Sequence, residues 1–198
     1  MKNTRTIEVC VYTRKIDDSE MPINAENTQN SIWAVAGRSR LMPAEIANTM
    51  INAGVSGDTS SGGRDRLDWS IPEGTEAVIL ELGANDALRG VDPAVTRAAL
   101  SDILARLKAR KIAVLLCGML APPNYGSEYA ARFNAIYPEL SKSFGVPLYP
   151  FFLEGVAANA RLNQADGMHP TAEGVDAIVK NMLPMVEAFL GTISGQRS

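Results

Sequence analysis

The only histidine of this 198-residue chain, His169, lies in the stretch "ADGMHP" (165–170), three residues after Asp166. An imidazole takes up and releases protons near neutral pH, which suits His169 to general-base catalysis. Asp166 has two interpretations: it orients the histidine ring, or it braces its own loop while a backbone carbonyl orients the ring. A lone histidine can also be purely structural, so the pair alone does not establish a function.

Two other polar loops offer hydrogen-bond donors that would complete an acyl-transfer site. Asn85 lies in "GAND", directly after an apolar run, and Gly57 lies in the glycine-rich stretch "GVSGDTSSGGRDR" (54–66). The side-chain amide of Asn85 and the backbone N–H of Gly57 could stabilise an oxyanion. Each also has a structural interpretation, since an asparagine can cap a loop and glycines often serve turns. With His169 as base, such a site still requires a nucleophile.

These loops need elements that bring them to one edge of the fold. Short, nearly continuous apolar runs at 77–82, 112–117 and 146–151 are typical of parallel strands covered on both faces, and "EIANTMI" (45–51) is a further probable strand. Helical patterns alternate with them, which predicts repeated β-α units on a parallel sheet. Ligands of such sheets bind at the carboxyl ends of the strands, so we expect the three loops to converge there.

The helices are predicted from apolar periodicity and from their ends. The first begins at Asp92 as N-cap and Pro93 and continues to about residue 111, and the second covers 127–144 before Gly145. The last starts at Thr171, and Pro184 should bend or break it near its middle. The stretch 54–66 is expected to be a loop at a strand end, with Asp58 and Thr59 available to cap the next helix.

Composition indicates one ordinary globular domain over 1–198, with 46% hydrophobic and 21% charged residues. A net charge of -3 argues against nucleic-acid binding, which normally needs a basic surplus. Cys10 and Cys117 lie in apolar runs and imply no disulfide framework. No segment is long and apolar enough to span a membrane, and no signal peptide is evident. We therefore expect a cytoplasmic protein, or a periplasmic or secreted one whose signal was removed; its oligomeric state stays open.

Five stretches together resemble the consecutive blocks of the SGNH (GDSL) hydrolases, in the branch of bacterial arylesterases and thioesterase I-type lysophospholipases. They are "INAGVSGDTSSGGRDRLDW", "ILELGANDALRG", "APPNYGSEYAARFNAIYPEL", "VPLYPFFLEGVA" and "LNQADGMHP", and they occur in family order between about 50 and 185. The resemblance implies a three-layer α/β/α, flavodoxin-like fold with a central parallel sheet. It also implies hydrolysis of carboxylic esters or thioesters of small aryl or acyl substrates through an acyl-enzyme, with no cofactor and no metal.

The resemblance assigns roles residue by residue. Gly57 and Asn85 correspond to the oxyanion-hole donors of the family, and Asp166 and His169 to its triad acid and base. The loop "APPNYGSEY" (121–129) borders the acyl pocket in relatives, which predicts that Pro122 and Tyr125 limit the chain length here.

The departure lies in the first block, where relatives have a strand that runs into Gly-Asp-Ser-Leu. Residues 1–49 contain no such motif and form an atypical N-terminal segment. Family spacing favours Ser19, which lies 33 residues before Asn52 and 14 residues before Trp33. Its acidic neighbours would oppose an anionic transition state; they are Asp17, Asp18 and Glu20.

Two alternatives to Ser19 remain at this point. Ser39 follows an apolar run in "IWAVAGRSR", but it leaves only twelve residues before the end of the next strand. If neither serine is competent, the chain is an inactive or ligand-binding protein of the same fold. A carbohydrate esterase of the same superfamily is a third hypothesis, and activity on acetylated sugars alone would support it.

Overall fold

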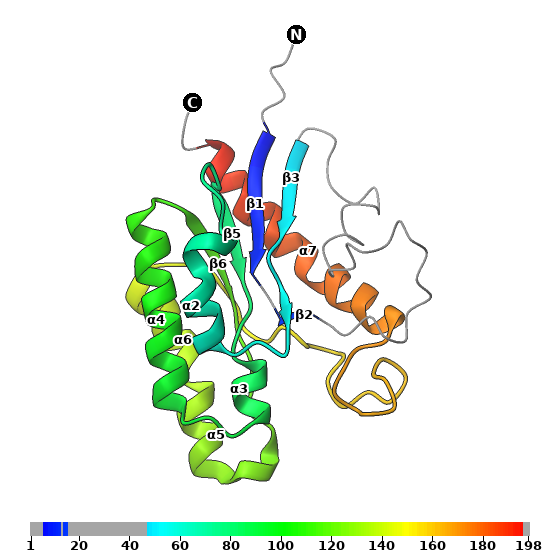
Figure 1. The fold of residues 1–198 in the computed structure, drawn as a ribbon. Coiled ribbons are helices and arrows are strands. Elements are labelled where there is room, and N and C mark those ends of the chain that lie inside the picture. Colours follow the sequence, from blue (N-terminus) through cyan, green and yellow to red (C-terminus); the bar gives the residue numbers. More distant parts are fainter. Residues whose placement is uncertain (1–5, 13, 16–46, 196–198) are drawn as a thin grey trace.

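The computed structural model of the chain describes residues 6–12, 14–15 and 47–195, which form a parallel sheet covered by helices on both faces (Figure 1). The main sheet has the strand order β3-β1-β5-β6-β7, and every neighbouring pair is parallel. Its strands are β1 (Thr6–Tyr12), β3 (Ala47–Asn52), β5 (Ala77–Leu80), β6 (Ala113–Cys117) and β7 (Leu148–Tyr149). The short strands β2 (Arg14–Lys15) and β4 (Val55–Ser56) pair with each other beyond the ends of β1 and β3.

Helices α2, α4 and α6 lie on one face of the sheet, and α7 lies on the other (Figure 1). The helices of the described residues are α2 (Ser60–Ser70), α3 (Ala84–Leu88), α4 (Pro93–Ala109), the short 3-10 helix η1 (Pro123–Tyr125), α5 (Gly126–Asn134), α6 (Ile136–Phe144) and α7 (Ala172–Gly195). These three layers confirm the predicted α/β/α fold. The sheet is open, so its carboxyl edge is available for a site.

Apolar residues on both faces explain why the central strands form. All four residues of β5 are fully buried, as expected for a strand covered by helices on each side. Burial of a large aliphatic side chain contributes roughly 1.5–3 kcal/mol, so the predicted runs at 77–82 and 112–117 supply much of the core. The run at 146–151 yields only the two-residue strand β7.

Strand β1 belongs to the atypical N-terminal segment, 1–49, in which the sequence analysis predicted no strand before residue 45. Thr6–Tyr12 lies between β3 and β5, with Val11 opposite Asn52 and Tyr12 opposite Leu80. The start of the chain therefore contributes a central strand, and its carboxyl end lies at the same edge as the ends of β3 and β5.

The capping predictions hold, because three predicted residues cap helices with their side chains. Asp92 accepts from the backbone N–H of Ala94 at 3.0 Å, ahead of Pro93. Thr59 and Thr171 cap α2 and α7 in the same way.

Three predicted elements differ from the structure. The stretch 54–66 is not a loop throughout, because α2 begins at Ser60 inside it. The helix predicted over 127–144 is two helices: Pro138 has no N–H for the carbonyl of Asn134, and its ring crowds that carbonyl. Conversely, Pro184 does not break α7, which continues from Ala172 to Gly195, and Met182 and Val186 on either side of the proline are both buried in the core.

Candidate active site

A hydrogen-bonded loop at the start of α7 holds His169 and Asp166 together. Gln164 N–H donates to the carbonyl of His169 at 2.7 Å, which closes the loop, and Gly167 adopts a φ of 70° at its tip. Asp166 Oδ1 accepts from the backbone N–H groups of Met168 at 2.8 Å and of His169 at 3.0 Å. The carboxylate therefore organises the backbone that carries the histidine.

The second oxygen of Asp166 contacts the imidazole directly. His169 Nδ1 and Asp166 Oδ2 are 2.5 Å apart. The hydrogen bond from the His169 side chain, followed by the two backbone N–H groups, holds the pKa of Asp166 well below its usual range. An ionised partner at Nδ1 favours the tautomer with its proton on Nδ1, which leaves Nε2 as the basic atom. The side chains of His169 and Asp166 are 30% and 37% exposed, so a substrate can reach them.

Asn85 lies in the first turn of α3, directly after the buried strand β5 and Gly83. Its Nδ2 donates to the carbonyl of Asp58 at 2.7 Å, which ties α3 to the loop that follows β4. An amide nitrogen carries two hydrogens, so one remains for a ligand. Gly83 turns the chain into α3 with a φ of 107°.

Gly57 lies at the end of β4 in the left-handed region, with a φ of 72°. Its carbonyl accepts from Arg89 Nη2 at 2.9 Å, so the guanidinium at the end of α3 fixes the orientation of this peptide. Arg89 and Asn85 together link the Gly57 loop to α3 at two points. The loop of Gly57 and the helix of Asn85, which carry the two residues predicted as oxyanion donors, are thus directly bonded to each other.

Three tyrosine hydroxyls hold the segment around α3, and the sequence analysis did not identify them. Tyr137, which is buried, donates to the carbonyl of Leu82 at 2.8 Å, and an added Cβ on Gly83 would lie 2.1 Å from that hydroxyl. Tyr125 donates to the carbonyl of Leu88 and Tyr129 to that of Val91, each at 2.9 Å. Together with Phe133 these tyrosines recur every fourth residue from η1 to α6, and that aromatic spacing is the signal that could have indicated them.

Asp86, next to Asn85, binds the start of α2. Its carboxylate is fully buried and accepts from Ser60 N–H at 2.8 Å, from Ser60 Oγ at 2.5 Å and from Thr96 Oγ1 at 3.0 Å. Asp86 thus joins α2, α3 and α4, a role that the sequence analysis did not identify. This network fixes the helix that carries Asn85.

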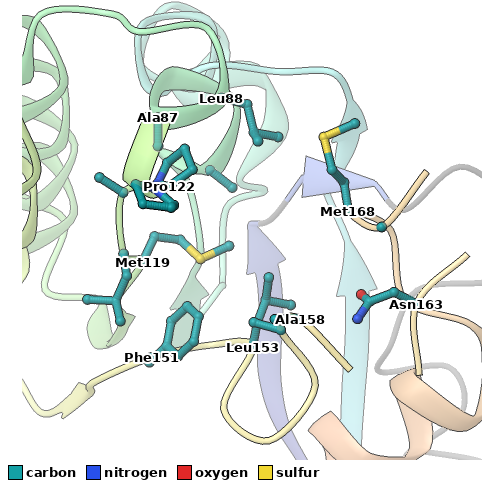
Figure 2. Close-up of a pocket in the computed structure, with 15 residues that line it drawn as sticks. Ala87, Leu88, Met119, Pro122, Phe151, Leu153, Ala158, Asn163 and Met168 are labelled. Carbon is teal, nitrogen blue, oxygen red and sulfur yellow. The ribbon is translucent and has the colours of Figure 1, made fainter. Parts of the chain in front are cut away.

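An apolar cavity of about 360 Å³ opens between α3 and the loop that carries the histidine (Figure 2). Ala84 and Ala87 line it from α3, and Gly167 and Met168 line it from the residues just before His169. Pro122 lines the cavity as well. Tyr125 is not among the described residues that line it, and its ring packs instead over Gly90.

The residues of this site occur in a chain that matches a known family along most of its length. The model of the GDSL-like Lipase/Acylhydrolase family matches residues 24–177. The chain belongs to this family. Its relatives include "Esterase TesA" of Pseudomonas aeruginosa, 36% identical over 159 residues that cover 80% of this chain and 79% of the relative. "Thioesterase 1/protease 1/lysophospholipase L1" of Escherichia coli is 41% identical over 143 residues, 70% of this chain and 69% of that protein.

Solved structures of family members share the fold. A crystal structure of TesA has a TM-score of 0.80 and 32% identity, and the match covers 92% of this chain and 99% of that one. The SGNH-hydrolase family esterase AlinE4 has a TM-score of 0.70 and 38% identity, with 93% and 96% of the chains covered. The predicted family, the predicted fold and the expected class of carboxylic ester hydrolase are confirmed.

The GDSL-like hydrolase site also needs a nucleophile, and both serine candidates, Ser19 and Ser39, lie outside the described residues. The described strand β2 gives the nearest reference point, because Lys15 pairs with Ser56, directly before Gly57. Within the described part of the chain, no group of three or more His, Cys, Asp or Glu side chains could hold a metal ion. No described helix is long and apolar enough to cross a membrane.

Proposed function

We propose that this chain hydrolyses carboxylic esters or thioesters of small aryl or acyl substrates through an acyl-enzyme on Ser19. The observation that carries the proposal is the 2.5 Å contact between Asp166 and His169 at the mouth of an apolar cavity. The base, the donors Gly57 and Asn85, and the cavity all lie at the carboxyl edge of the sheet. The names of the relatives, which include an esterase and a thioesterase, support the substrate class.

In the proposed reaction His169 Nε2 removes the hydroxyl proton of Ser19 while Oγ attacks the carbonyl carbon. The N–H groups of Gly57 and Asn85 donate to the oxyanion, with the backbone N–H of the nucleophile as third donor. The intermediate expels the alcohol or thiol, which takes the proton from His169. Water then attacks the acyl-enzyme, again with His169 as base, and releases the acid. Asp166 stabilises the imidazolium that forms in each half of the cycle.

Chain connectivity supports Ser19 over Ser39. Ser19 is four residues after Lys15, and four extended residues span at most about 14 Å, so its backbone is tethered close to the Lys15–Ser56 pair beside Gly57. Ser39 is eight residues before Ala47, at the amino end of β3, and eight extended residues span up to about 28 Å, so its chain connection restrains it much less closely. The acidic neighbours of Ser19 would have to turn away from the oxyanion for this assignment to hold.

A fluorophosphonate probe tests the proposal, because it labels an activated serine whatever the substrate. We expect one adduct on Ser19, mapped by peptide mass spectrometry, that disappears in Ser19→Ala and in His169→Ala but persists in the matched variant Ser39→Ala. An adduct on Ser39 would move the nucleophile and keep the chemistry. The absence of any adduct in protein with an intact far-UV spectrum would refute the hydrolase and favour the ligand-binding alternative. A panel of aryl esters, acyl thioesters and acetylated sugars then identifies the substrate class.

A further inference from the structure

The described residues give the cavity beside His169 apolar walls and one polar side chain. Among the described residues that line it, Asn163 alone has a side chain with hydrogen-bonding atoms. Figure 2 shows Asn163 on the side of Met168, across the cavity from Met119 and Pro122. A wall of this kind binds hydrocarbon, so a single polar atom within it selects among hydrocarbon ligands.

The amide of Asn163 has a fixed orientation. Its Nδ2 donates to the carbonyl of Val156 at 2.6 Å and to the carbonyl of Asn159 at 2.9 Å. Two carbonyl acceptors can only be met by the NH₂ group, so Oδ1 must lie on the other side of the amide plane. The whole residue is only 7% exposed, and both donors are used within the protein.

The remaining atom, Asn163 Oδ1, is an acceptor that has no donor among the residues that the structure describes. Oδ1 is also not fully enclosed by protein atoms, so it is accessible at the cavity wall. Water can satisfy this oxygen in the free protein, but a plain hydrocarbon chain that fills the cavity displaces that water and leaves the acceptor unpaired.

We propose that the cavity takes an acyl group that is mostly hydrocarbon and carries one hydrogen-bond donor, a hydroxyl or an amide N–H, and that Asn163 selects it. This inference rests on the proposed function for its link to turnover, because the cavity begins next to the catalytic pair. The donor on the chain meets Asn163 Oδ1 while the rest of the chain contacts residues such as Met119 and Leu153. Asn163 is thus a specificity residue that takes no part in bond making or breaking.

A kinetic comparison of esters of equal length tests the selection. The substrates are ethyl octanoate, its hydroxy derivatives at an inner, a middle and the terminal carbon, and an acetamido-substituted ester of the same length. We expect at least one derivative to exceed ethyl octanoate about tenfold in kcat/KM, the value of one good hydrogen bond. The position of the preferred donor along the chain then reports its distance from the reacting carbonyl. The inference is wrong if ethyl octanoate is the best substrate of the series.

Two variants attribute the preference to this side chain. Asn163→Leu should remove or reverse it, because the new wall is apolar throughout. The matched control is Asn181→Leu. It deletes a similar hydrogen bond of a side-chain amide, from Asn181 Nδ2 to the carbonyl of Glu154 at 3.0 Å, outside the cavity. It should leave the preference of the wild type unchanged.

A binding measurement separates this inference from the proposed function and needs neither turnover nor a variant. The N-ethyl amides that match the esters are titrated into the wild-type protein by calorimetry. Tighter binding of a hydroxylated or acetamido amide supports the inference, even if no fluorophosphonate adduct forms and the hydrolase proposal fails. Equal or tighter binding of plain N-ethyl octanamide would overturn it, even in an active enzyme.

Discussion

Replacement of Asp166 by asparagine tests the catalytic geometry with little change of shape. In the wild type Asp166 Oδ2 accepts from His169 Nδ1, whereas an asparagine can direct its NH₂ group at that nitrogen. Nδ1 then becomes an acceptor, the ring proton moves to Nε2, and the basic atom that faces the substrate is lost. The same tautomer change in a serine protease lowers kcat about 10⁴-fold, and we expect a loss of this order here.

The stability of the variants follows from the other oxygen. Asp166 Oδ1 accepts two backbone N–H groups, from Met168 and His169, which an asparagine oxygen can still do. Asp166→Ala removes both bonds. At about 1 kcal/mol each, discounted for the 37% exposure of the side chain, the free energy of unfolding should fall by about 1–2 kcal/mol. For a chain of this size that lowers Tm by about 2–8 °C.

Kinetics and melting on the same protein samples distinguish these effects. The assay measures kcat on an aryl ester at neutral pH and Tm by calorimetry for wild type, Asp166→Asn and Asp166→Ala. Both variants should lose activity, but only the alanine variant should lose clear stability. An asparagine variant with kcat within tenfold of wild type would refute the tautomer argument and leave Asp166 as a brace for its loop.

The same carboxylate predicts a pH dependence of stability. Its pKa is lowered in the folded protein, first by the His169 side chain and then by the backbone N–H groups. A depressed carboxylate pKa stabilises the fold above its ordinary value of about 4, and the contribution is lost as the pH falls below that value. Wild type should therefore lose stability faster than Asp166→Asn below about pH 4. Parallel acid melts of the two proteins would contradict this assignment.

Three further predictions concern the scaffold, each checked by urea unfolding at neutral pH. Tyr137→Phe deletes the hydroxyl that donates to the carbonyl of Leu82, so the free energy of unfolding should fall by about 1–2 kcal/mol. Because this loosens α3, kcat on an aryl ester should fall more than KM changes, and an unchanged kcat would show that the bond does not affect the site. Asp86→Ala leaves three buried donors without their acceptor, Ser60 among them, and should cost roughly 3 kcal/mol or more; a smaller loss would mean that the network is dispensable. Lys111→Gly should instead raise stability by about 1 kcal/mol, because a lysine is strained at a φ of 59° and glycine is not; a loss of stability would contradict this.

The hydrogen bonds around α3 show why part of the site could not be predicted from the sequence. Asn85 was identifiable because it follows a buried strand in a recognisable motif. Its partners were not, since the carbonyl of Asp58 is 27 residues away and the hydroxyl of Tyr137 lies 55 residues from Leu82. Bonds between backbone carbonyls and distant side chains leave no local pattern, because a carbonyl is present at every position.

What the sequence determined by itself is the layered α/β fold, the family, three helix caps and the local Asp166–His169 pair. The fold class, the caps and the pair depend on short-range signals: apolar periodicity, capping residues, and a carboxylate three positions from an imidazole on one tight loop. The family follows from the resemblance of five sequence blocks in family order. Only the tertiary structure decided where α2 begins, that Tyr125 packs over Gly90 rather than at the cavity, and that Asn163 leaves an acceptor facing it. Those outcomes depend on which distant groups meet when the sheet and helices pack, and only the folded chain brings those groups together.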